Sequence, residues 1–311
     1  MTATEAEALP HDPAFRCAPW TQAQGVDPVG STVQLDHLLL VEWPLPWPAD
    51  VGDIPELAEA ATADKRTRVM CVVPRLDDGD DGRFRVVHHR RVGPHELRGV
   101  DHRVPLAEIP ALLRSIQADP AADSSGWPTA VGPSPPEVLV CGHGKRDACC
   151  GRWGTLLHVE LMARSTDVRV WRCSHTGGHR FAPTAITLPD GRGWAYADAD
   201  LLEAVVRRRG DLALISPHDR GTSALSPWAQ VVERAVLRER GWSWLDEPRL
   251  HAEVTVREDG EAADVILEWD GGRATAVVVI ERTIPVLVCG YPPEAAQKSS
   301  AEYGIRDLRI T

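Results

Sequence analysis

The pattern of apolar and polar positions predicts the same order of secondary-structure elements twice along the chain. In the first stretch, alternating and β-branched residues predict strands, and helical spacing of apolar residues predicts helices. The segments in chain order are VQLDHLLLVEW, DIPELAEAATA, TRVMCVVPR, GRFRVVHHR after a DDGDDG turn, and PLAEIPALLRSIQA. The predicted order is β-α-β-β-α. Residues 119–136, rich in Pro, Ser and Gly, are typical of a linker.

The second stretch has the same predicted order of elements. Its segments are the strand PEVLVCG, the helix ACCGRWGTLLHVELMAR, the strand DVRVWRCS, the strand and hairpin AITLPDGRGWAYAD, and the helix DADLLEAVVRRRG. The last helix begins with acids and ends with arginines, which suits the helix dipole. We therefore expect an α/β protein with two topologically similar halves, an expectation that rests on element order because the halves share no visible identity.

The remaining segments complete the expected organisation. A helix, SPWAQVVERAVLRERG, precedes alternating segments separated by DG turns, which predict a small antiparallel β-meander. PVLVCG is a candidate last strand, followed by a polar tail. The predicted units are an irregular N-terminal arm (1–30), a first half with its linker (31–133), a second half (134–225), and a helix with a C-terminal β-meander (226–311).

Composition narrows the classes of function. The formal net charge of −11 argues against a nucleic-acid or anionic-membrane surface, because phosphate contacts need clustered Lys and Arg. The first residues, MTATEAEALP, are acidic and lack an apolar stretch, so we expect no signal peptide, no membrane span and a cytoplasmic location. Seven cysteines in a reducing compartment indicate metal binding or catalysis more than disulfides.

Two polar clusters hold the candidate chemistry. Cys141 ends a predicted strand and Cys150 lies in the first turn of the next helix, within CGHGKRDACC; His175 and His179 frame two glycines in HTGGH, after the next strand. Loops that leave the carboxyl ends of neighbouring parallel strands meet in space, so the two pairs should face each other. Two thiolates and two imidazoles are a ligand set for zinc or for an iron–sulfur cluster, and the spacing leaves both open.

The two motifs, VCGHGKRDACCG and WRCSHTGGHRFAPTAITLPDG, resemble those of the sucrase/ferredoxin-like family, as does the earlier LLLVEWPLPW. The resemblance spans residues 30–225. It implies a thioredoxin-like ferredoxin domain that binds a [2Fe–2S] cluster through two Cys and two His. In the family pattern the second Cys directly precedes a Gly, so the resemblance assigns the ligands to Cys141, Cys150, His175 and His179.

The resemblance implies one-electron transfer, so we expect an electron carrier more than an enzyme, with a flavin- or NAD(P)H-dependent reductase as redox partner. Ligation by two neutral histidines should raise the reduction potential above that of an all-Cys cluster and allow coupled proton uptake. A zinc-stabilised binding module remains the alternative, and a thiol-dependent enzyme is a weaker one. A second ligand set, Cys141, His143, Cys173 and His175, fits the Rieske spacing less well because position 176 is Thr.

Residues around the motifs have expected supporting roles. Gly177 and Gly178 permit positive φ and close wrapping of the backbone. The other residues that we expect beside the cluster or at a partner surface are His143, Lys145, Arg146, Cys149, Arg172 and Arg180. Cys17, Cys71, Cys173 and Cys289 are expected to be small apolar core residues.

Overall fold

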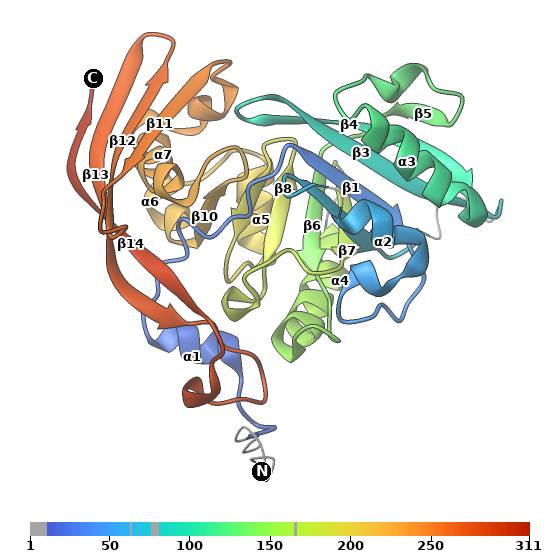
Figure 1. The fold of residues 1–311 in the computed structure, drawn as a ribbon, viewed down its shortest axis with the longest axis horizontal. Helices are drawn as coiled ribbons and strands as arrows, with labels where there is room; N and C mark the ends of the chain where they lie inside the picture. Colours follow the sequence, from blue (N-terminus) through green and yellow to red (C-terminus); the bar gives the residue numbers. More distant parts are fainter. Residues whose placement is uncertain (1–10, 63, 76–80, 165–166) are drawn as a thin grey trace, which may run out of the picture.

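The computed structural model describes residues 11–62, 64–75, 81–164 and 167–311. Residues 1–10 of the predicted arm and residues 77–80 of the predicted turn lie outside the described residues. The fold is mixed α/β, with a large mixed sheet and a small antiparallel sheet (Figure 1).

The large sheet contains two quartets of strands with the same order and the same directions. The first quartet runs β2 (Thr67–Val72), β1 (His37–Glu42), β3 (Arg83–Gly93) and β4 (Glu96–Pro105). The second runs β7 (Arg169–Cys173), β6 (Glu137–Cys141), β8 (Ala185–Leu188) and β9 (Arg192–Trp194). In each quartet the first pair is parallel and the other neighbours are antiparallel. The repeated element order expected from the sequence is therefore matched by repeated strand pairing.

The two quartets meet at a short antiparallel contact, where Val72 of β2 pairs with Cys173 of β7. Side chains on one face of each quartet pack against each other in a shared core that includes Leu38, Leu40, Leu139 and Trp171. Successive residues of a strand point to opposite faces of the sheet. The residues that alternate with these core residues therefore face the helices. The halves are thus joined mainly by apolar packing, and the backbone pairing between them is short.

Each half carries its helices on the outer face. In the first half, α2 (Pro55–Thr62) and α3 (Ile109–Ala118) cover Leu39, Val41 and Val69. In the second half, α4 (Thr155–Arg164) and α5 (Ala199–Val206) cover Val138 and Val140. Full burial of one such side chain stabilises the fold by about 1.5–3 kcal/mol.

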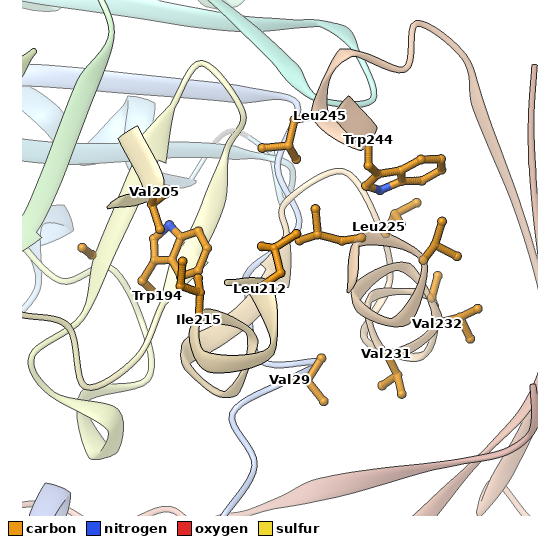
Figure 2. Close-up of a cluster of buried hydrophobic side chains, with 14 of the residues drawn as sticks. Val29, Trp194, Val205, Leu212, Ile215, Leu225, Val231, Val232, Trp244 and Leu245 are labelled. Atoms are coloured by element: carbon orange, nitrogen blue, oxygen red, sulfur yellow. The ribbon is translucent and has the colours of Figure 1, made fainter. Parts of the chain in front are cut away.

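The C-terminal part extends the outer core of the second half. It comprises α6 (Leu212–Ile215), β10 (Asp219–Thr222), α7 (Pro227–Arg240), and a sheet of β11 (Leu250–Val256), β12 (Ala262–Trp269), β13 (Gly272–Pro285) and β14 (Ser299–Ile310). Figure 2 shows Trp194 and Val205 of the second half near Leu212 and Ile215 of α6, in the same buried cluster as α7. The region is therefore packed onto the second half through one continuous core.

Several elements differ from the expectations. The arm contains α1 (Cys17–Ala23), the linker contains β5 (Ala130–Pro133), and β4, α6, β10 and β14 were not predicted. The candidate last strand PVLVCG is not a strand: β13 ends at its Pro285, and the rest belongs to the loop before β14. The sequence of β4, ELRGVDHRVP, lacks a clean alternation because it buries polar residues, among them Asp101 and His102. The tail expected to be polar and irregular is β14, which pairs along the length of β13.

The N-terminal segment lies beside the loop that joins the last two strands. In Figure 1, α1 sits next to the loop of residues 286–298 that joins β13 to β14. Backbone hydrogen bonds connect Asp12 N–H to the Gly290 carbonyl at 2.8 Å and Gly290 N–H to the Phe15 carbonyl at 3.1 Å. This arrangement brings the N-terminal segment and the 286–298 loop to the carboxyl ends of β6 and β7, where Cys17 and Leu287 pack with Cys141.

Candidate metal centre

Cys141 and Cys150 lie together because a helix begins directly above the end of β6. Cys141 is the last residue of β6, and Cys150 opens a π-helical turn (Cys150–Gly154) that continues into α4. Both thiols are fully buried. A π-helical turn at the start of a helix is a common feature of functional sites.

Two glycines permit this close approach of helix and strand. A Cβ at Gly154 would overlap the carbonyl oxygen of Cys141, and a Cβ at Gly151 would overlap the Cα of Gly144. Only glycine fits where backbones are in direct contact. The Cys-Gly pair of the motif therefore has a steric basis in this fold.

The loop after β7 brings the two histidines to the same place. Gly177 and Gly178 have φ values of 90° and 66°, a conformation that favours glycine, and they turn the chain between His175 and His179. The two imidazole rings lie 5.5 Å apart between centroids. His175 also interacts with the Cys141 thiol. Contacts therefore link Cys141 to Cys150 and to His175, and His175 to His179.

Each histidine leaves one ring nitrogen without a protein partner. His179 Nε2 donates to the Leu287 carbonyl at 2.7 Å, which leaves Nδ1 as the acceptor atom. The Nδ1 atoms of both His175 and His179 are buried without a hydrogen-bond partner among the described residues. A buried nitrogen lone pair without a partner costs free energy unless it binds something. The donor set therefore fits a thiophilic metal or an iron–sulfur cluster.

The charges at the site favour a thiolate and neutral histidine. Cys150 and His175 hold the pKa of Cys141 well below its usual value, although burial opposes them. Burial lowers the pKa of His175, against the attraction of Cys141. Thiolate sulfur and neutral imidazole are the forms that ligate metals.

The predicted supporting residues occupy different places. The buried His143 donates through Nε2 to the Pro48 carbonyl at 2.8 Å, and Arg172 donates to the Gly142 carbonyl at 3.2 Å. Arg180 turns toward β14, where it donates to Ser300 Oγ at 2.8 Å. Lys145 and Arg146 are exposed, and Arg146 lines an open pocket with His143 and His175.

The remaining cysteines divide into core residues and an unexpected cluster. Cys71 and Cys173 pack in apolar cores, as expected. Cys17 and Cys289 were also expected in the core, but with Cys149 and Asp147 they form a group whose ligand-type atoms all lie within 4.8 Å of one another. No spacing rule connects Cys149 with Cys289, which lies 140 residues away, so only the fold reveals this group.

A comparison with protein families matches most of the chain. The model of the family described as sucrase/ferredoxin-like matches residues 28–221, which is more than half of the chain and includes both motifs. The chain belongs to the sucrase/ferredoxin-like family. Cys17 and Cys289 both lie outside the matched residues.

Two curated relatives match a short part of the chain. Altered inheritance of mitochondria protein 32 from Meyerozyma guilliermondii is 38% identical over 58 residues, 17% of this chain and 21% of the relative. The protein of the same name from Debaryomyces hansenii is 39% identical over 59 residues, 18% of this chain and 22% of the relative. The chain therefore aligns with about a fifth of the length of the curated relatives that it matches.

No solved structure matches the fold significantly. Among the residues that the structure describes, no helix is both long and apolar enough to cross a bilayer. The cytoplasmic location stays a prediction.

Proposed function

We propose that this protein is an electron carrier whose [2Fe–2S] cluster is held by Cys141, Cys150, His175 and His179. The observation that carries the proposal is the pair of buried, unpartnered Nδ1 atoms beside two buried thiols. Membership of the sucrase/ferredoxin-like family supports it. When bound, the cluster would accept and donate single electrons at a potential above that of an all-Cys ferredoxin.

We also propose that each half is thioredoxin-like. The support is the β-α-β-β-β-α order of each half, with one parallel pair and an antiparallel hairpin in both quartets. In this arrangement the cluster ligands occupy the second half alone. The first half then serves as a packing partner that covers the face holding Trp171 and Cys173.

The protein's own residues would hold the ligands in their binding forms. The Leu287 carbonyl fixes the His179 tautomer by accepting its Nε2 proton. His175 and His179 are half-buried, so solvent reaches their rings and protons can be exchanged there. Gly154 and Gly151 keep the start of the helix close to Cys141.

The proposed partner is a flavin- or NAD(P)H-dependent reductase. Lys145 and Arg146 are exposed on the same loop as Cys141, and Arg146 shares an open pocket with His175. This basic surface suits an acidic docking site and contrasts with the net charge of −11. Electrons would then enter or leave the cluster on the side where the half-buried histidines lie.

The test is the colour and the paramagnetic signal of the protein purified without oxygen. We expect iron and acid-labile sulfide, visible absorption, and a rhombic electron paramagnetic resonance signal after dithionite reduction. Changing both His175→Ala and His179→Ala should abolish or shift this signal, whereas His251→Ala, on the exposed side of β11, should leave it unchanged.

A colourless protein that holds zinc at these four residues would favour a binding module and overturn the electron-transfer proposal. A coloured protein whose spectrum survives loss of both histidines would overturn the ligand assignment.

A further inference from the structure

A second group of sulfur atoms lies beside the proposed cluster ligands and packs in the same small core as Cys141 and Cys150. It consists of Cys17 of α1, Cys149 before the π-helical turn, Cys289 of the 286–298 loop, and Asp147; we call it the Cys17 cluster. Cys17, Cys149 and Asp147 are buried, and Cys289 is half-buried. Cys149 and Cys150 are consecutive, yet Cys150 interacts with Cys141 whereas Cys149 contacts Cys289.

The distances in the Cys17 cluster describe atoms arranged about one point. Cys289 Sγ lies 3.2 Å from Cys149 Sγ and 3.6 Å from Cys17 Sγ. Asp147 Oδ1 lies 3.5 Å from Cys17 Sγ and 3.3 Å from Cys289 Sγ. A tetrahedral zinc ion with bonds of about 2.3 Å to sulfur and 2.0 Å to oxygen has ligand separations of roughly 3.5–3.8 Å. The cluster is therefore close to the size of a zinc tetrahedron.

A disulfide would explain the group less well. It would join two of the three sulfurs at about 2.05 Å and leave the third thiol and the carboxylate buried beside it. A metal ion engages all four groups at once. Three thiolates and one carboxylate carry the same formal charge as the four thiolates of a common structural zinc site.

Backbone groups already orient the members of the cluster. Asp147 Oδ1 accepts from Cys149 N–H at 2.9 Å, and Asp147 Oδ2 accepts from Cys289 N–H at 3.0 Å. Such hydrogen bonds to a ligating carboxylate fix its direction. Without a cation, these four groups cannot all be charged in a buried site.

We propose that Cys17, Asp147, Cys149 and Cys289 bind one zinc ion that fastens the N-terminal segment and the 286–298 loop to the loop after β6. Binding would release the thiol protons to solvent, because the thiolate is the ligand. The zinc ion would hold the 286–298 loop in place, and with it the Leu287 carbonyl that orients His179. Cys17 and Cys289 lie outside the residues matched by the family, so the site would be an addition of this chain to the family domain.

The experiment counts zinc and iron separately in the full chain, purified without oxygen. We expect about one zinc per chain in the unaltered protein. The double variant Cys17→Ser, Cys289→Ser should lose the zinc but keep its iron, and Cys141→Ser should lose iron but keep zinc. Cys71→Ala, a buried cysteine in the first-half core, is the matched control and should keep both metals.

Cobalt gives a second measurement that does not depend on the double variant. Protein produced with cobalt in place of zinc should show the visible bands of a tetrahedral thiolate site, and Cys289→Ser alone, a change at a half-buried loop position, should weaken them. Loss of zinc should also increase hydrogen exchange in residues 11–25 and 286–298. Unaltered protein with iron but no zinc, or with a Cys149–Cys289 disulfide by mass spectrometry, would overturn the proposal.

Because the two metals are counted independently, this test can fail while the electron-transfer proposal stands. The reverse also holds: zinc without iron that is lost in the Cys17→Ser, Cys289→Ser variant but kept in Cys141→Ser would support the Cys17 cluster and remove the [2Fe–2S] proposal.

Discussion

Arg220 is a fully buried cation under the histidine loop. It donates to the Gly177 carbonyl at 3.0 Å and to the Ser31 carbonyl at 2.6 Å, and no carboxylate among the described residues forms an ion pair with it. Burial, together with Arg180 and Arg68, lowers the pKa of Arg220 to about 9, which leaves it charged at neutral pH. Cys141 and Cys150 oppose this shift, so Arg220 lies within electrostatic range of both cysteines.

We predict that Arg220→Met lowers the reduction potential, because a buried positive charge stabilises the reduced, more negative site. The shift should be on the order of tens of millivolts, where 59 mV corresponds to a tenfold change for one electron. Arg220→Lys keeps the charge and should retain most of the potential. Potentiometry followed by visible absorption measures both variants; equal potentials for Met and Lys would contradict the role of charge.

The two histidines give a second prediction at the residue level. His175→Cys and His179→Cys should each lower the potential on the order of 100 mV or more, because each change adds a negative charge at the ligand position. The pH dependence of the potential should weaken at the same time, because a protonatable imidazole is removed. An unchanged midpoint for either variant would exclude that histidine as a ligand.

At the level of elements, the site depends on how closely one helix approaches one strand. Gly154 lies in the π-helical turn, where any side chain would overlap the end of β6 at Cys141. The π-helical turn therefore cannot keep its present position if residue 154 is larger than glycine. Cys150, four residues earlier, would move with it.

We predict that Gly154→Ala destabilises the protein by about 3 kcal/mol or more and lowers its iron content, because backbone contacts cannot adjust as a flexible side chain can. Gly126→Ala is the matched control, since a Cβ there meets nothing within 4 Å and its φ is not positive. Denaturant unfolding and iron analysis measure the two effects. Wild-type behaviour of Gly154→Ala would show that helix and strand can separate without loss of the site.

The elements also show how far the sequence predicted this molecule. Strands with strong alternation or continuous apolar runs, such as β1, β6 and β12, were predicted, and so was the meeting of the two motifs, because adjacent parallel strands end at one edge. In contrast, β14 has a polar sequence and gains its order by pairing with β13. Cys17 and Cys289 meet Cys149 through contacts between distant segments, which local patterns do not encode.

On the scale of the whole molecule, the two halves are connected by a buried ionic network as well as by apolar packing. Glu137 of β6 accepts from His89 Nε2 of β3 at 2.6 Å, from Arg169 Nε of β7 at 2.6 Å and from Trp171 Nε1 at 2.7 Å. Arg169 also pairs with Asp101 of β4 at 2.5 Å. Each half therefore supplies charges that the other half neutralises.

This network predicts an acid-sensitive connection between the halves. Burial raises the pKa of Glu137, but His89, Arg169 and Trp171 outweigh it and lower the pKa from its ordinary value of 4.5 to about 2. A carboxylate with a lowered pKa in the folded chain stabilises the fold above pH 4.5, and this stabilisation is lost as the pH falls toward 2. The contribution at neutral pH is on the order of 3 kcal/mol.

We predict that Glu137→Gln lowers the free energy of unfolding by about 3–5 kcal/mol at neutral pH, because it removes the carboxylate that accepts from Arg169, Trp171 and His89 inside the buried junction. The variant should also lose less stability between pH 4.5 and pH 2, so that its free energy of unfolding approaches that of the unaltered protein at low pH. Thermal unfolding across this range measures both effects, with the exposed Glu258→Gln as control. A constant difference at every pH would mean that Glu137 stabilises the junction by packing alone, and that charge does not connect the two halves.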